Sequence, residues 1–208
     1  MSLFHDVTNK PWDQVGLPDG IDPKPVFRAS SASVALTIFL GVVSVVFSLL
    51  LVSYYIRMQL GDWVPVALPD LLWTNTGVLV LSSVFMQLAV TRNRHEEQTQ
   101  FAKGAGLLFL LGGLLAVAFI AGQYMAWTEL VAAGQGVRAN PSNAFFYLLT
   151  GVHALHLIGG LWVWSRAEIR ISQGVPASDI HLSIKLCTVY WHFLLLIWVG
   201  LFVLLSYT

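Results

Sequence analysis

The sequence predicts an all-α integral membrane protein in which five transmembrane helices form a bundle. Of its 208 residues, 56% are hydrophobic and only 11% are charged, and the mean hydropathy is +0.71. A soluble domain carries roughly 25% charged residues, so this composition is typical of a protein embedded in a bilayer. Eleven Lys and Arg residues balance eleven Asp and Glu residues, which excludes a basic surface that would attract nucleic acid. The single cysteine, Cys187, excludes a disulfide scaffold.

Long stretches without a charged residue place the five helices. A helix needs about 20 predominantly apolar residues to span a membrane. The uncharged runs contain 28, 21, 25, 27 and 23 residues, and they lie between Arg28 and Arg57, between Asp70 and Arg92, between Lys103 and Glu129, between Arg138 and Arg166, and after Lys185. They predict helices near residues 31–56, 68–91, 104–128, 143–165 and 184–207.

The first thirty residues differ from the rest of the chain. They are polar and contain four prolines, Pro11, Pro18, Pro23 and Pro25. They lack the short apolar core near the start that a signal peptide would have, so we expect the first helix to be retained. The sequence thus divides into a polar tail at 1–30 and a single membrane domain at 31–208. The tail either lies extended on the membrane surface or a partner, or is disordered.

The distribution of basic residues predicts the orientation in the membrane. Cytoplasmic loops of membrane proteins carry an excess of Lys and Arg. The N-terminal tail, the loop after the second helix and the loop after the fourth helix together hold nine of these residues, whereas the opposite side holds only Arg57 and Arg138. We therefore expect a cytoplasmic N-terminus, an external C-terminus and a location in the plasma (inner) membrane.

Polar side chains inside the second and third helices predict contacts between helices. Asn75 and Ser82 are seven residues apart and therefore share one helix face. Polar groups are costly in lipid, so such a stripe is expected to pack on another helix. The alternative, a transport path, is not favoured because no charged residue lies deep in this helix. In the third helix, Gly112 and Ala116 permit close approach of a neighbouring helix, and Gln123 requires a hydrogen-bond partner.

Three histidines lie within the last two predicted helices. His153 and His156 are three residues apart and lie on neighbouring positions of one face, and His192 lies in the final helix. Their spacing allows two interpretations: hydrogen bonding between helices, or ligation of a metal or haem by neutral imidazole. The depths of His153 and His192 could match, so the spacing does not exclude ligation. The chain has no CxxC or HExxH arrangement and no glycine-rich phosphate loop, so enzyme chemistry of those kinds is not indicated.

Four motifs in the correct order resemble subunit III of the haem-copper oxidases. The fourth helix reads TGVHALHLIGG, the fifth reads YWHFLLLIWVGLF, the second reads LWTNTGVLVLSS, and the third ends with a glutamine and a nearby aromatic residue. Together these motifs span residues 73–202 and are specific. The residues that carry the resemblance are Asn75, Thr76, Ser82, Ser83, Gln123, Trp127, Thr150, Gly151, His153, His156, Trp191, His192 and Trp198. Five helices resemble the shorter bacterial form, without the two additional N-terminal helices of the seven-helix form.

The resemblance implies an accessory role beside subunits I and II of a respiratory oxidase that reduces oxygen and pumps protons. In that family haem and copper belong to the partner subunits, and subunit III stabilises subunit I and binds phospholipid. The chain therefore should have no catalytic, cofactor-binding or metal-binding residues of its own. Members often carry acidic residues where this chain has Ala126 and Leu195, so the resemblance does not extend to carboxylate-dependent proton collection. The alternatives are a subunit III-like component associated with a nitric oxide reductase, and an independent haem b electron carrier that uses the three histidines.

Overall fold

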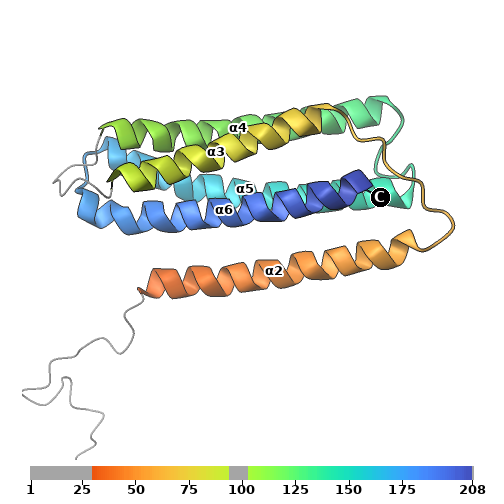
Figure 1. Cartoon of the computed structure of the whole chain (residues 1–208), viewed down its shortest axis with the longest axis horizontal. Coiled ribbons are helices and arrows are strands. Elements are labelled where there is room, and N and C mark those ends of the chain that lie inside the picture. The colour runs from red at the N-terminus through yellow and green to blue at the C-terminus, as the bar shows by residue number, and fades with distance from the viewer. Residues whose placement is uncertain (1–29, 94–102, 208) are drawn as a thin grey trace, which may run out of the picture. The chain divides into compact units, whose positions relative to one another are not determined.

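The computed structural model describes residues 30–93 and 103–207, and this described part is built from five long α-helices and no strand (Figure 1). The helices are α2 (Ser31–Met58), α3 (Leu71–Asn93), α4 (Lys103–Ala132), α5 (Pro141–Ser172) and α6 (Ala177–Tyr207). All five are long and apolar enough to cross a membrane, which confirms the expected fold class. The chain divides into two compact units, residues 1–34 and 35–208. Apart from Ser30, the expected N-terminal tail lies outside the described residues.

Two helices are much longer than their uncharged runs. α5 continues to Ser172 rather than ending at residue 165, and α6 begins at Ala177 rather than at residue 184. A helix of 32 residues is about 48 Å long, whereas the hydrocarbon core is about 30 Å thick. The charged ends of these helices, including Arg166 and Arg170, therefore extend beyond the hydrocarbon. In the other direction, α3 begins at Leu71 instead of residue 68, because the residue before a proline, here Leu68 before Pro69, is disfavoured in the helical conformation.

Local sequence signals fix the two ends of α5. The side chain of Asn140 caps the N-terminus by accepting a hydrogen bond from the backbone nitrogen of Asn143 at 2.9 Å, and Pro141 occupies the first turn. At the other end Gly174 has a φ of 73°, a conformation that glycine adopts without steric cost. These signals set where the chain turns between neighbouring helices.

A surface ion pair joins the last turn of α2 to the loop that follows it. Arg57 donates two hydrogen bonds to the carboxylate of Asp62, at 2.6 and 2.5 Å. These hydrogen bonds hold the pKa of Asp62 below its ordinary value. Asp62 is exposed, so the pair fixes local geometry more than it stabilises the fold.

Helices α3, α4, α5 and α6 form a closed bundle in which each helix packs against two others. The pairs in contact are α3 with α4, α4 with α5, α5 with α6, and α6 with α3. Figure 1 shows α3 and α4 running side by side over most of their length. α2 contacts the bundle through its side chains: the ring of Phe39 lies 6.0 Å from that of Tyr190 on α6, and the ring of Phe47 lies 5.6 Å from that of His156 on α5.

Glycines at helix contacts leave room for large side chains on the neighbouring helix. A Cβ atom on Gly113 would collide with the indole of Trp164, and one on Gly160 would lie 2.8 Å from Trp191. Gly112 faces Met86 of α3, as expected for a small residue at a close contact. The sequence singled out Gly112 but not its neighbour Gly113, which is the tighter of the two positions.

Candidate functional site: the polar interior of the bundle

Polar side chains join α3 to α4 through backbone carbonyls. The side-chain nitrogen of Asn75 donates to the carbonyl oxygen of Phe119 at 3.0 Å and, more weakly, to Oε1 of Gln123 at 3.5 Å. Two turns further along the same face of α3, the hydroxyl of Ser82 donates to the carbonyl oxygen of Gly112 at 2.7 Å. Asn75, Ser82 and Gln123 are all buried. The polar stripe of α3 that contains Asn75 and Ser82 therefore packs against α4, in agreement with the predicted contact between helices.

Two tryptophans join α6 to α3. The indole nitrogen of Trp191 donates to the hydroxyl oxygen of Ser82 at 3.0 Å, and that of Trp198 donates to the hydroxyl oxygen of Thr76 at 3.0 Å. Both indoles are almost fully buried. A buried indole N–H must find an acceptor, and here each acceptor is a hydroxyl on a neighbouring helix. Thr76 in turn donates to the carbonyl of Leu72 in its own helix, which orients its oxygen.

A similar pair of tryptophans joins α4 and α5. Trp127 donates to the hydroxyl oxygen of Thr150 at 3.1 Å, and its indole lies beside Gly151, where an added Cβ atom would be in ordinary van der Waals contact with the ring. Trp164 of α5 donates to the carbonyl oxygen of Phe109 at 3.0 Å. The sequence motifs did not include Trp164. The adjacent glycines Gly112 and Gly113, which make room for a large side chain, were the signal that could have identified this contact.

His153 lies at the centre of the bundle and is enclosed by aromatic rings. Its imidazole is fully buried, 5.1 Å from the ring of Trp198 and 6.0 Å from the ring of Phe119. Neither ring nitrogen has a hydrogen-bond partner among the described residues. The structure thus places His153 in aromatic packing and not in a hydrogen bond to another helix.

His156 lies on the side of α5 that meets α2. Its Nδ1 atom is 2.8 Å from the carbonyl oxygen of Val152, so Nδ1 carries the proton and donates. Its ring packs between Phe39 and Phe47 of α2, at centroid distances of 6.3 and 5.6 Å. The backbone carbonyl of His156 also accepts a hydrogen bond from the hydroxyl of Tyr190 at 3.0 Å.

His192 forms a third, separate environment between α6 and α3. Its Nε2 atom lies 2.9 Å from Oε1 of Gln87, and its Nδ1 atom is hydrogen-bonded to the hydroxyl of Ser83. Because the amide oxygen of Gln87 can only accept, Nε2 donates and Nδ1 accepts from Ser83. His192 therefore holds α6 to α3 through both of its ring nitrogens.

The three histidines do not fit a haem site. His153 is enclosed by rings, both nitrogens of His192 are used by α3, and Nδ1 of His156 is bound to its own helix. Across residues 30–93 and 103–207, no three His, Cys, Asp or Glu side chains are grouped so that they could hold a metal ion. The three imidazoles lie in separate environments, and among them only His192 has both ring nitrogens in hydrogen bonds.

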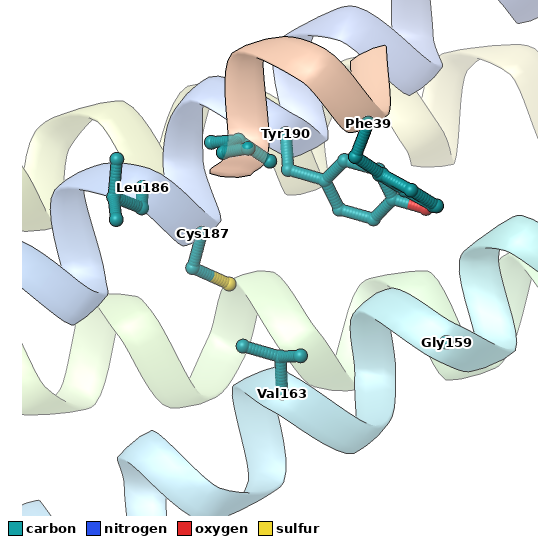
Figure 2. Close-up of a pocket in the computed structure, with 7 residues that line it drawn as sticks. Phe39, Gly159, Val163, Leu186, Cys187 and Tyr190 are labelled. Carbon is teal, nitrogen blue, oxygen red and sulfur yellow. The ribbon is translucent and has the colours of Figure 1, made fainter. Parts of the chain in front are cut away.

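An apolar groove lies where α2 faces α5 and α6. It has a volume of about 320 Å³ and is lined by Leu36, Phe39, Gly159, Val163, Leu186, Cys187 and Tyr190. Figure 2 shows the thiol of Cys187 pointing toward Val163, with Phe39 lying over the ring of Tyr190. The aliphatic and aromatic composition of this groove suits a hydrocarbon chain.

Comparison with known proteins agrees with the motifs. The family model described as cytochrome c oxidase subunit III matches residues 36–208. A probable cytochrome c oxidase subunit 3 of Nocardia farcinica is 29% identical over 187 residues, which cover 84% of this chain and 87% of that protein. Cytochrome c oxidase subunit 3 of Synechocystis is 29% identical over 173 residues, which cover 80% and 71%. Cytochrome bo(3) ubiquinol oxidase subunit 3 of Pseudomonas aeruginosa is 28% identical over 128 residues, which cover 61% and 59%.

The polar contacts described above involve the residues that carry the sequence motifs, and the family match covers α3 to α6 and α2 from residue 36 onward. The described structure has the all-helical, membrane-spanning fold that this match requires. The chain therefore belongs to the cytochrome c oxidase subunit III family, and it is an accessory subunit of a haem-copper oxidase in the bacterial inner membrane.

Proposed function

We propose that this chain supports its oxidase mechanically and through bound lipid, as a non-redox partner of subunits I and II. The observation that carries the proposal is that the motif residues form hydrogen bonds between helices. Ser82, Thr76 and Thr150 accept hydrogen bonds from three tryptophans, and His192 bonds to α3. These contacts support a structural role for the motif residues, and in this proposal haem and copper belong to the partner subunits.

The groove between α2 and the bundle supports the lipid part of the proposal. Its lining is apolar, and the outward side chains of Phe39 and Val163 are exposed to the bilayer. A phospholipid acyl chain lying there buries apolar surface on both sides and completes the contact between α2 and α5. By this route the subunit stabilises subunit I during proton-pumping oxygen reduction, without a membrane-embedded carboxylate of its own.

Three further assignments belong to the same proposal. The N-terminus lies in the cytoplasm and the C-terminus lies outside, because nine of the eleven basic residues are then cytoplasmic. Residues 1–30 form a tail, and residues 31–208 form a single membrane domain.

The test is a strain that lacks this chain, with the remaining oxidase purified and its oxygen uptake followed over many turnovers. We expect full haem and copper content and normal initial turnover, followed by faster loss of activity than in the complete oxidase. Retained haem and copper with no turnover from the first measurement would refute the accessory role. A decay rate equal to that of the complete oxidase would refute the protective role.

A further inference from the structure

Three buried atoms on two adjacent helices of the bundle lack a hydrogen-bond partner among the described residues. They are Nε2 of Gln123 on α4 and both ring nitrogens of His153 on α5. The two residues are themselves almost completely buried, with exposures of 2% and 0%. In folded proteins nearly all buried polar atoms are bonded to protein or to ordered water, because an unpartnered one is costly in an apolar interior. These atoms therefore require a partner.

Contacts between α4 and α5 place the two side chains at the same level of their interface. Trp127 donates to the hydroxyl of Thr150, and the ring of Phe119 lies 6.0 Å from that of His153. Gln123 is four residues from both Phe119 and Trp127, so it shares their face of α4 and lies between the two contacts. His153 takes part in one contact and lies within one turn of Thr150. The side chains of Gln123 and His153 therefore enter the same part of the interface.

The unpartnered groups are a donor and an acceptor that do not bond to each other directly. Oε1 of Gln123 accepts the weak hydrogen bond from Asn75 at 3.5 Å, so Nε2 is the end left without a partner, and it can only donate. A neutral imidazole has one nitrogen that accepts and one that donates. The donating nitrogen of His153 lies among the rings of Phe119 and Trp198, and aromatic faces accept N–H groups weakly. The accepting nitrogen has no such contact available.

We propose that an ordered water molecule is bound between Gln123 and His153 inside the bundle. It accepts a hydrogen bond from Nε2 of Gln123 and donates one to the unprotonated ring nitrogen of His153. The water thus joins α4 to α5 at a level where these two side chains form no direct hydrogen bond. The inference concerns the interior of this chain and does not depend on the accessory role proposed above.

Three properties of the site select water over other occupants. The chain's own helices bury both side chains, so an acyl chain or a helix of a partner subunit does not reach them. The rings of Phe119 and Trp198 lie around His153, so an ion of either sign would exchange its hydration shell for aromatic carbon. Water is uncharged, donates and accepts at once, occupies only about 30 Å³ and is held by as few as two hydrogen bonds.

Electron cryomicroscopy of the purified, complete oxidase tests the site directly, in a map whose resolution shows ordered water elsewhere in the complex. We expect a separate density peak about 2.7–3.2 Å from both Nε2 of Gln123 and one ring nitrogen of His153. In the His153→Phe oxidase this peak should be absent, while the other ordered waters remain. A map of that quality with no peak between the two side chains, or with Gln123 bonded directly to His153, would overturn the proposal. A peak that persists in the variant would do the same.

A double-mutant cycle tests whether the two side chains act through one water. Gln123→Met and His153→Phe each remove a hydrogen-bonding group and keep a similar volume. In each single variant the water loses one of its two partners, so the temperature at which half of the chain is lost from the purified oxidase should fall by about 2–6 °C. The double variant loses the same link only once, so its midpoint should fall by less than the sum of the two single effects.

Thr188→Val is the matched control for this cycle. The hydroxyl of Thr188 is also buried without a partner among the described residues, but Thr188 lies about 15 Å along α6 from Trp198, the residue that contacts His153. Its effect should add to that of Gln123→Met, because separated sites act independently. Equal additivity for His153→Phe and for the control would overturn the proposal. So would a raised midpoint in both single variants, which is the result expected for groups that have no partner at all.

Discussion

Replacing Gly113 by alanine tests whether the bundle is as tightly packed as its contacts indicate. The Cβ atom of an alanine at this position would collide with carbons of the Trp164 indole, so the ring must move. Forcing an additional methyl group into a packed contact costs about 1–3 kcal/mol. Displacement of the ring also breaks the 3.0 Å hydrogen bond from Trp164 to Phe109, which contributes about 1 kcal/mol. Alanine in a helix gains about 1 kcal/mol over glycine, so the net destabilisation is about 1–3 kcal/mol.

The assay is the temperature at which half of the chain is lost from the purified oxidase on a native gel. For a chain of this size, each kcal/mol lowers a midpoint by about 2–4 °C, so Gly113→Ala should lower it by about 2–12 °C. Gly77→Ala is the matched control, because no atom lies within 4 Å of its added Cβ. That variant should be neutral or slightly stabilised. A Gly113→Ala oxidase with a midpoint at or above the wild-type value would refute the reasoning.

Three further predictions follow from the same structure. Reporter fusions at Thr208 and within residues 92–103 should report an external C-terminus and a cytoplasmic loop, and an external 92–103 loop would contradict the proposed orientation. Alanine at His153, His156 or His192 should weaken retention of the subunit modestly, by about 0.6–1.7 kcal/mol where hydrogen bonds are lost, and should leave the haem spectra of the oxidase unchanged; a shifted haem spectrum would show that a histidine contacts a cofactor. Because Arg57 lowers the pKa of Asp62, any stability that this pair contributes is present above the ordinary carboxyl pKa and is lost only as pH falls through the lowered value. Asp62→Asn should therefore change the thermal midpoint by the same amount at about pH 7 and about pH 5, and a difference that vanishes at the lower pH would contradict the lowered pKa.

The number of helices could be predicted from the sequence because charge is excluded from hydrocarbon. The helix ends could be predicted less well, because the length of an uncharged run reflects the thickness of the hydrocarbon core and not the length of the helix. α5 continues past Arg166 to Ser172 because the backbone hydrogen bonds of a helix also form outside the hydrocarbon core. The start of α3 at Leu71 depends on Pro69, a local restriction on the backbone that hydropathy does not record.

The contacts of the polar residues were only partly predictable. The positions of Asn75 and Ser82 on one face were sufficient to predict contact with another helix. Which helix they contact depends on the order of the bundle, and this requires the three-dimensional structure. His153 shows the limit most clearly: its type and spacing suggested a ligand or a hydrogen-bonding group, whereas it lies among the rings of Phe119 and Trp198.

The hydrogen bonds between α3 and α6 have a consequence for the order in which the protein is assembled during translation. Ser82 and Trp191 are 109 residues apart in the chain, and Thr76 and Trp198 are 122 residues apart. At about 5–20 residues per second, the ribosome makes α6 roughly 5–25 seconds after α3. Once α4 has packed against α3, the hydroxyls of Thr76 and Ser82 donate to carbonyls of α3 itself and of α4, which leaves the lone pairs of their oxygens to accept from another helix. In that order of assembly, α6 docks against acceptor oxygens that α3 and α4 have already oriented.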